Sequence, residues 1–477
     1  MTHPQLVVRD AVVVLPEAGL LNGHIVVEDG KVSRLLPISE DAPDAERTVD
    51  AAGRFVLPGA IDPHCHYGLI PPVSERMAPE SAFAALGGIT TLVRYFRRPD
   101  SYLRSLPPHI AADPAYHYQD FSVHLAIFNE AQVAEIPRYV EELGITSFKM
   151  YTNLKAAVAK AFLIDPLVGD TELQTADLDY DDGLLISVME ALAALPVRTR
   201  LSVHVEEADL VIRQTERVRA LGLEGLLAWH YARPEEAEAL GVRKVAYLSR
   251  QLGVPVYFPH IGSRLAIEVL VEELAVGTDL VAETCPHYLV HNVESPAANL
   301  LKVMPPVRTK EDNLATWDAL HEGVLSTIGT DHIPYPEEVK RGADIWRTRP
   351  GFGSFGLMVP VMLSAGVNSG KLTIGQVAQV TSTNVAKAFG LYPMKGSLLP
   401  GSDADLIIVD LDREWTVHAA DLASLQSFSV YEGMRLRGAV DVTVSRGEVI
   451  CEDGHMAVDP GRGCFITRYP QLRRLSA

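Results

Sequence analysis

Short apolar runs alternate with longer amphipathic stretches through most of the chain. In the longer stretches, such as 130–143, 183–195 and 234–252, apolar residues recur at the three- and four-residue spacing of a helix that buries one face. The short runs are rich in β-branched and aromatic residues, which is typical of strands buried on both faces of a parallel sheet. Eight such runs occur, at 55–64, 88–96, 121–128, 145–151, 200–206, 254–260, 280–289 and 324–332.

The alternation of strands and helices predicts an α/β fold. Eight βα units with long connections fit a (β/α)8 TIM barrel, whose site is built at the carboxyl ends of the strands. A doubly wound open sheet is the competing layout, but no G-x-G-x-x-G motif follows the first strand. Two irregular segments, 152–182 and 333–356, follow the fourth and eighth runs, and we expect them to build or cover the site.

Both ends of the chain differ from its middle. Residues 5–57 and 396–460 read as short strands joined by turns, with Asp29-Gly30 and Asp453-Gly454 as hairpin turns. Neither end has enough strands for a core of its own, so we predict that the two ends form one small β-sandwich domain. The predicted division is 1–57 for its N-terminal part, 58–395 for the barrel, and 396–477 for its C-terminal part and tail.

Composition and charge narrow the classes of function. With 47% apolar and 22% charged residues the composition is that of a globular protein, and a net charge of −19 disfavours binding to nucleic acid or anionic membranes. The single basic–aromatic cluster, RYFRRPD around 95–100, is typical of a solvated helix or loop. Four widely spaced cysteines make no disulfide framework, and the sequence shows no signal-peptide pattern or membrane-spanning apolar run. We expect a cytoplasmic protein.

Side chains of the kind that bind metals lie near the carboxyl ends of five of the eight runs. His64 and His66 close the first run, and because side chains alternate along a strand they point the same way and can hold one cation. One such histidine alone is more often structural, but a shared position at the rim of a barrel predicts a metal site. The other candidates, on the fourth, fifth, sixth and eighth runs, are Lys149, His204, His260 and Asp331.

Eight segments carry a resemblance to a known family. In chain order they are GAIDPHCH, GITSFKMY, SVHVEE, FPHIGS, ETCPHYL, VMPPVR, IGTDHIP and LPGSDADLIIVD. With these segments the sequence resembles the amidohydrolase superfamily, and within it the cyclic amidohydrolase branch of hydantoinases, dihydropyrimidinases and allantoinases. The segments span about residues 55–410.

The resemblance implies a binuclear metal centre, usually of zinc, inside a barrel flanked by a small β-domain. The implied reaction is hydrolysis of a cyclic amide, in which a hydroxide that bridges the metals attacks the ring carbonyl and Asp331 is the proton shuttle. Carboxylation of a lysine fits this chemistry, because a protonated amine would repel two cations whereas a carbamate offers them two anionic oxygens. The implied ligands are His64, His66 and Asp331 for the first ion, His204 and His260 for the second, and Lys149, carboxylated by carbon dioxide, as the bridge.

The chain departs from the family pattern near the substrate. Hydantoinases and dihydropyrimidinases carry a tyrosine five residues after the bridging lysine, where it donates a hydrogen bond to the developing oxyanion; here that position is Leu154. We expect Tyr151, Asn153 or a loop residue to replace it, or the substrate to be held differently. Dihydroorotases typically have an arginine two residues after the second histidine of the H-x-H motif, and Gly68 at that position argues against dihydroorotate.

Four further residues are candidates for supporting roles. Asp62 either orients a ligand or is a turn residue before Pro63, and Arg308 either meets a substrate carboxylate or braces a loop. His287 is predicted to support the site rather than to bind metal, and His332 to help hold the hydroxide or a loop.

Several alternatives stay open. The ring could be a hydantoin, a dihydropyrimidine, allantoin, a cyclic imide or a lactam, and manganese, cobalt or iron suit the same ligands as zinc. A mononuclear deaminase is disfavoured by Lys149, and a non-catalytic dihydropyrimidinase-like scaffold by the complete set of ligand positions. We expect a small cyclic amide as substrate and a homodimer or homotetramer as the assembly.

Overall fold

Eight parallel strands form a barrel-like sheet in the computed structural model, which describes residues 3–68, 73–155, 160–162, 175–177, 180–342 and 344–468. Neighbouring strands follow one another in chain order, as in a (β/α)8 barrel, and this confirms the predicted fold class. The strands are β6 (Ala60–Cys65), β7 (Ile89–Phe96), β8 (Asp120–Ala126), β9 (Ser147–Tyr151), β12 (Arg200–His204), β13 (Val256–Phe258), β14 (Leu280–Thr284) and β15 (Thr327–Ile328).

The barrel closes between its first and last strands through residues at their carboxyl ends. The backbone N–H of Asp331 donates to the carbonyl of His64 at 2.9 Å, and the N–H of His66 donates to the carbonyl of His332 at 2.8 Å. The eighth apolar run, predicted as a strand over 324–332, is in fact the two-residue β15 followed by this irregular closure. The closure therefore joins three candidate ligands through main-chain hydrogen bonds.

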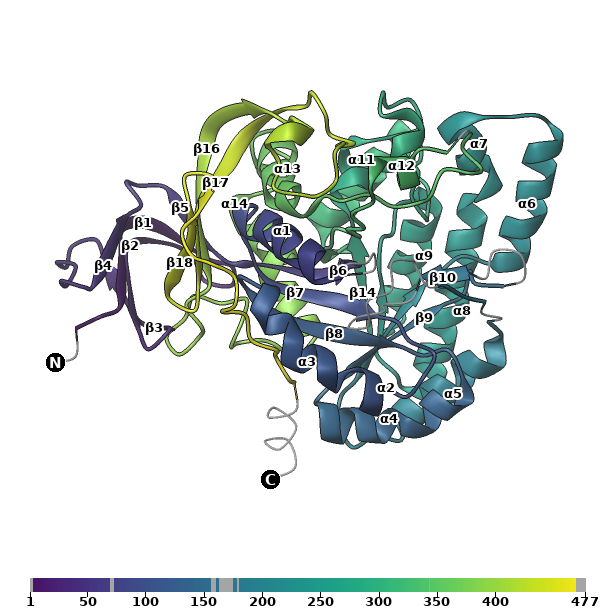
Figure 1. The fold of residues 1–477 in the computed structure, drawn as a ribbon, viewed down its shortest axis with the longest axis horizontal. Helices are drawn as coiled ribbons and strands as arrows, with labels where there is room; N and C mark the ends of the chain where they lie inside the picture. The colour runs from purple at the N-terminus through teal and green to yellow at the C-terminus, as the bar shows by residue number, and fades with distance from the viewer. Residues whose placement is uncertain are drawn as a thin grey trace.

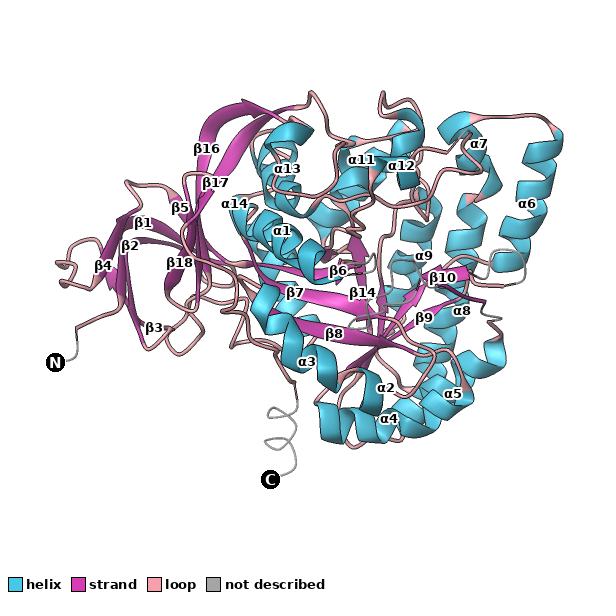
Figure 2. Ribbon diagram, in the orientation of Figure 1, coloured by secondary structure: helices cyan, strands magenta, loops and turns pink. Residues whose placement is uncertain are grey.

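Helices cover the outside of the barrel strands (Figure 2). Local sequence signals set their ends: Asn129 caps α4 by accepting from the N–H of Gln132, and Gly144, with φ of 68°, ends it. Among the described helices, none combines the length and the apolarity needed to cross a membrane. The helices are α1 (Val73–Leu86), α2 (Tyr102–Ser105), α3 (Pro107–Ala112), α4 (Glu130–Leu143), α5 (Asp182–Ala193), α6 (Ala208–Ala220), α7 (Gly225–Ala232), α8 (Glu235–Leu252), α9 (Arg264–Ala275), α10 (Pro286–Val290), α11 (Lys310–Glu322), α12 (Glu337–Lys340), α13 (Met358–Val361), α14 (Ile374–Ala378) and α15 (Asn384–Ala388).

A second sheet combines the two ends of the chain, as predicted. Figure 1 shows the purple N-terminal strands beside the yellow C-terminal ones, to the left of the barrel. The hairpin turns are confirmed: Asp29 and Gly30 have φ of 51° and 73°, and Asp453 and Gly454 have φ of 52° and 78°. The strands, which enclose a separate apolar core, are β1 (Leu6–Leu15), β2 (Gly19–Glu28), β3 (Lys31–Pro37), β4 (Arg47–Asp50), β5 (Phe55–Pro58), β16 (Leu406–Thr416), β17 (Arg435–Ser445), β18 (Glu448–Glu452) and β19 (His455–Met456).

The first apolar run serves both sheets. We predicted one strand over 55–64, and this is wrong: β5 pairs with β16 in the terminal sheet, whereas β6 pairs with β7 in the barrel. Gly59 is the single residue between them. A Cβ atom at Gly59 would lie 2.3 Å from Oγ1 of Thr90, so only glycine fits this crossing point.

Two buried lysines fix the loop that follows β15. Lys302 donates through Nζ to the carbonyls of Ile345 at 2.7 Å and Thr348 at 2.6 Å, and Lys340 donates to the carbonyl of Gly351 at 2.6 Å. This loop is the predicted segment 333–356, and four of its residues line a cavity at the carboxyl ends of the barrel strands. Of the other predicted segment, 152–182, the structure describes residues 152–155, 160–162, 175–177 and 180–182. They include the short antiparallel pair β10 (Lys160–Phe162) and β11 (Thr175–Asp177).

Candidate metal centre

A single cavity at the carboxyl ends of the barrel strands collects all six predicted ligands. Its walls come from β6, β9 and β12, from residues that follow β6, β7, β9, β13 and β15, and from Met304. The sequence rule that placed ligands at strand ends therefore brings them together in space. The lining residues are His64, His66, Arg97, Lys149, Tyr151, Asn153, Leu154, His204, His260, Met304, Asp331, Ile333, Tyr335, Pro350 and Gly351.

Two imidazoles and one carboxylate meet at a single point. Nε2 of His64 and Nε2 of His66 each lie 3.1 Å from Oδ1 of Asp331. Burial by itself lowers the pKa of His64, but Glu283 and Asp331 outweigh it and raise the pKa to about 9. A cation bound here would therefore displace a proton from His64, as is usual when metals bind histidine.

The remaining ligands lie next to this group. The ring centres of His204 and His260 are 4.5 Å apart, and His260 lies 5.1 Å from His64. Lys149, in β9, is buried in the same cavity, with its Nζ 4.6 Å from the centre of the Tyr95 ring and no hydrogen-bond partner among the described residues. Burial lowers the pKa of Lys149 to about 7, against the opposing charges of Glu283 and Asp331. A large fraction of the lysine is thus a neutral, nucleophilic amine near neutral pH.

Two candidate ligands have a backbone conformation that side-chain-bearing residues rarely adopt. His260 has φ of 46° and Asp331 has φ of 51°, both in the left-handed region. Such residues cost about 1–3 kcal/mol each and cluster at functional sites, where the surrounding structure holds them in place. The strain supports an assignment of these two side chains to the site.

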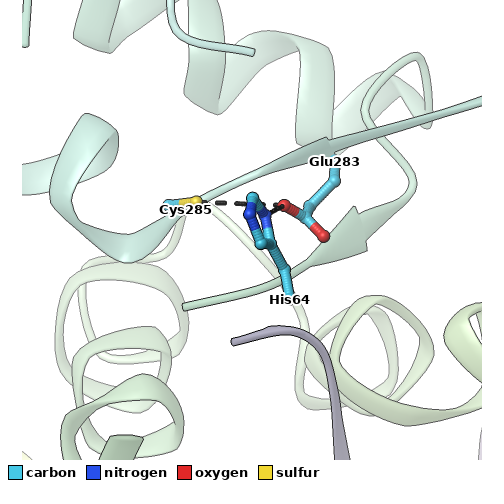
Figure 3. Close-up of side chains that lie close together, drawn as sticks. All are labelled: His64, Glu283 and Cys285. Carbon is cyan, nitrogen blue, oxygen red and sulfur yellow. Dashed lines mark hydrogen bonds and ion pairs between the residues drawn. The ribbon is translucent and has the colours of Figure 1, made fainter. Parts of the chain in front are cut away.

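Glu283 on β14 orients the His64 ring. Its Oε1 lies 2.7 Å from Nδ1 of His64 and accepts from the N–H of His260 at 3.1 Å, while its Oε2 accepts from the Tyr257 hydroxyl at 2.6 Å. Figure 3 shows the carboxylate turned toward the ring, with the Cys285 thiol 4.0 Å from the same oxygen. Nδ1 of His64 is thereby engaged, which leaves Nε2 for a metal ion.

His64, Glu283 and Cys285 lie close enough together to hold a metal ion, but their contacts favour a supporting role for this group. Glu283 already accepts hydrogen bonds at both oxygens. Burial also raises the pKa of the Cys285 thiol well above its usual value, so a thiolate ligand is disfavoured.

Glu206 orients His204 in the same manner. Its Oε2 lies 2.7 Å from Nε2 of His204, and its Oε1 accepts from Nε of Arg233 at 2.8 Å. Burial alone would raise the pKa of Glu206, but Arg233 and His204 outweigh it and lower the pKa to about 2. This carboxylate therefore stays ionised, and Nδ1 of His204 remains available to a cation.

Replacement of Glu283 by glutamine is expected to lower kcat/KM by ~10–100-fold, the usual loss when a partner of a metal-binding histidine is removed. The amide has one acceptor oxygen and cannot accept from both His64 and Tyr257 as the carboxylate does. Steady-state kinetics and the metal content of the purified variant measure the effect.

Glu273→Gln is the matched control, because Glu273 is also buried but pairs with Arg243 and Arg250 away from the cavity. It should lower the melting temperature without lowering kcat/KM of the folded protein. Equal kinetic losses in the two variants would show that Glu283 acts through stability alone.

The residues present fit a pair of divalent cations. Four imidazoles and a carboxylate are ligands that zinc and similar ions take, and a lysine with a lowered pKa in the same cavity is suited to carboxylation. Nζ of Lys149 and Nδ1 of His260 are buried without a hydrogen bond among the described residues, and such orphaned groups call for a partner.

The predicted substrate contacts separate into two groups. Tyr151 and Asn153 line the cavity, and the Tyr151 hydroxyl and Oδ1 of Asn153 have no hydrogen-bond partner among the described residues. Leu154 lines it too, so the departure from the family pattern lies at the site itself. Arg308, in contrast, is not brought to the cavity: its guanidinium pairs with Glu238 at 2.8 Å, which favours the loop-bracing alternative.

Two of the predicted supporting residues, Asp62 and His332, accept hydrogen bonds from backbone N–H groups and not from the side chains of the candidate ligands. Asp62 accepts from the N–H groups of His64 at 3.0 Å and Thr330 at 3.1 Å, and so fixes the chain on both sides of the barrel closure. His332 stacks on Phe355 with ring centres 3.5 Å apart and accepts from the N–H of Ser354, which anchors the loop after β15. His287 is buried, but its ring nitrogens make no hydrogen bond among the described residues, so its supporting role stays a prediction.

One cluster was misjudged from the sequence. RYFRRPD is the carboxyl end of β7 and the start of the following loop, and Arg94 and Arg97 are buried instead of solvated. Arg94 pairs with Asp113, whereas Arg97 lines the cavity. The sequence does carry a signal for the position of Arg97, because this residue directly follows an apolar run just as the predicted ligands do.

Comparison with known proteins identifies the class. A model of the amidohydrolase family matches residues 230–450. An L-hydantoinase from Paenarthrobacter aurescens is 31% identical over 474 residues, which cover 94% of this chain and 95% of that protein, and a D-hydantoinase from Ralstonia pickettii is 28% identical over 97% and 98%. The chain belongs to the amidohydrolase family.

Solved structures narrow the class to one branch. A dihydropyrimidinase from Brevibacillus agri NCHU1002 superposes with a TM-score of 0.85 at 26% identity, covering 97% of this chain and 98% of that one. An L-hydantoinase from Arthrobacter aurescens gives a TM-score of 0.86 at 28% identity, covering 98% and 100%. The chain is a member of the cyclic amidohydrolase branch, as the sequence motifs indicated.

Proposed function

We propose that ring opening takes place in the cavity around Asp331, in a chain whose family makes it a hydrolase of cyclic amides. The observation that carries this proposal is the meeting of His64 and His66 on one oxygen of Asp331, with Lys149, His204 and His260 in the same cavity. The overall reaction adds water across the ring C–N bond and gives a carboxylate and a free urea or amide end.

His64, His66 and Asp331 would hold one divalent ion, and His204 and His260 a second. Lys149, carboxylated by carbon dioxide, would bridge them; its burial and lowered pKa support this role. Zinc is our choice of metal, because imidazole and carboxylate ligands are those it prefers. When bound, such ions supply a nucleophilic water at neutral pH and polarise a carbonyl group.

Asp331 moves the proton. Its Oδ1 lies 3.1 Å from Nε2 of His64 and from Nε2 of His66, so Oδ2 is the oxygen left to take a proton. Burial alone would raise the pKa of Asp331, but His64 and His66 hold it well below its usual value, so the carboxylate is ionised and can accept. Oδ2 takes the proton of the attacking water and passes it to the ring nitrogen as the C–N bond breaks.

Tyr151 takes the place of the missing oxyanion donor at Leu154. Its hydroxyl lies in the cavity, where Arg97 is its neighbour, and it comes from the same strand as Lys149. Burial raises the pKa of Tyr151 to about 12, so the hydroxyl keeps its proton and donates a hydrogen bond to the carbonyl oxygen of the ring.

The test is a panel of hydantoin, dihydrouracil, allantoin, succinimide and dihydroorotate, assayed with metal-replete protein. Opening of at least one ring, with loss of turnover on chelation and recovery when zinc returns, is the expected result. Protein that retains its metals and opens none of these rings contradicts the proposal. The homodimer or homotetramer and the cytoplasmic location stay predictions from the sequence.

A further inference from the structure

Arg97 reaches into the cavity beside the candidate metal ligands. It follows directly after β7, two residues beyond Tyr95, whose ring lies 4.9 Å from that of His64. Since side chains alternate along a strand, Arg97 and Tyr95 point to the same side. Arg97 is only 6% exposed and shares the cavity wall with Lys149 and Tyr151.

The guanidinium of Arg97 has no anionic partner among the described residues. Its Nε and Nη2 are buried and make no hydrogen bond there. Asp331 is the only carboxylate among the described lining residues, and its Oδ1 already lies 3.1 Å from both His64 and His66. The nearby Arg94 and Arg98 differ from Arg97 in this respect, because each has a carboxylate partner. Arg94 pairs with Asp113, and Arg98 pairs with Asp100 at 3.1 Å.

A buried cation without a partner is costly, so a site that keeps one is built for an anion that arrives with the ligand. Guanidinium presents a planar fork of donors that matches a carboxylate through two parallel hydrogen bonds. Hydantoin and dihydrouracil are uncharged and offer no such group. A ring that carries a carboxylate does.

We infer that Arg97 binds a carboxylate substituent of the substrate, so that the physiological ring is an anionic cyclic amide rather than a neutral one. This inference rests on the proposed function and specifies its substrate class. Two residues after the H-x-H motif, where dihydroorotases typically have an arginine, this chain has Gly68. Arg97, which follows the neighbouring strand β7, supplies a cation instead. Arg97 is a specificity-determining residue, since it touches the substituent and not the reacting carbonyl.

The experiment compares matched rings with and without a carboxylate: hydantoin against hydantoin-5-acetate, and dihydrouracil against dihydroorotate. The metal-replete wild type should favour at least one carboxylate-bearing member by tenfold or more in kcat/KM. In Arg97→Met the ratio of charged to neutral kcat/KM should fall ~30-fold or more, mainly through a higher KM, since truncating one partner of a buried charged pair has an effect of this size. Arg97→Lys should recover part of the ratio.

Arg98→Met is the control, because this adjacent arginine has its own carboxylate partner and does not line the cavity. It should leave the ratio of charged to neutral turnover unchanged. Wild-type protein that opens neutral rings without any preference for the charged members overturns the inference and leaves the proposed function intact. A loss of equal size on both members in Arg97→Met also overturns it, since Arg97 would then act on the reacting carbonyl. Failure to open any ring rejects both.

Discussion

Replacement of Lys149 by alanine is expected to abolish hydrolysis, with kcat/KM falling by well over ~100-fold, beyond the loss seen when a supporting residue is removed. On the proposed function, the change removes the amine that would carry the bridging carboxylate, and His64, His66, His204 and His260 would lose their common anion. Bound metal should fall below two ions per chain. Kinetics on a ring that the wild type opens and elemental analysis of the purified variant measure the two effects.

Chemical rescue makes this result specific. Truncation leaves a hole the size of a short acid, so added propionate should restore part of the activity of Lys149→Ala by supplying two anionic oxygens. Lys310→Ala is the control, since Lys310 is exposed and pairs with Glu294 at 2.6 Å; its kinetics should match the wild type. Full turnover and full metal content in Lys149→Ala would show that Lys149 is not a metal ligand.

The second large effect is expected for Asp331→Asn, with kcat reduced ~10²–10⁴-fold, the usual contribution of a positioned acid–base group. The amide cannot take up the proton at Oδ2. Asparagine tolerates the left-handed conformation that Asp331 adopts at φ of 51°, so the barrel closure should survive. Turnover and thermal unfolding measured on the same preparation separate the two effects.

Asp441→Asn provides the comparison, because Asp441 is buried in the terminal sheet and pairs with Arg54 and Arg413. It should destabilise the protein and leave kcat unchanged. If Asp331→Asn keeps wild-type kcat with normal metal content, another group carries the proton.

The sequence was sufficient to find the candidate ligands because of how a parallel barrel is built. Every strand ends at the same rim, so polar residues that follow apolar runs meet there whatever their separation along the chain. His64 and Asp331 lie far apart in sequence and yet share a hydrogen bond between their backbones. The terminal strands were recognisable for a different reason, since Asp-Gly pairs favour the turns of tight hairpins.

What the sequence did not reveal depends on long-range pairing. Glu283 lies inside a short apolar strand and acquires its role only when β14 places it against His64. The partner of Arg308 is Glu238, and no local pattern connects the two. Arg97 was missed for another reason: basic residues beside aromatic ones favour a solvated reading, which ignores that a strand ends there. A charged residue at the carboxyl end of a barrel strand predicts a place in the site, as a histidine at the same position does.

The crossing at Gly59 ties the histidine pair to the terminal sheet. With one residue between β5 and β6, any rotation of the terminal sheet about the barrel is passed directly to the strand that carries His64. In a chain shortened to its barrel, β6 would begin at the new N-terminus, a few residues before His64. The pairing of β5 with the terminal sheet would no longer fix the position of β6. We therefore expect that exchanging or trimming the two-ended sheet would shift the candidate metal ligands.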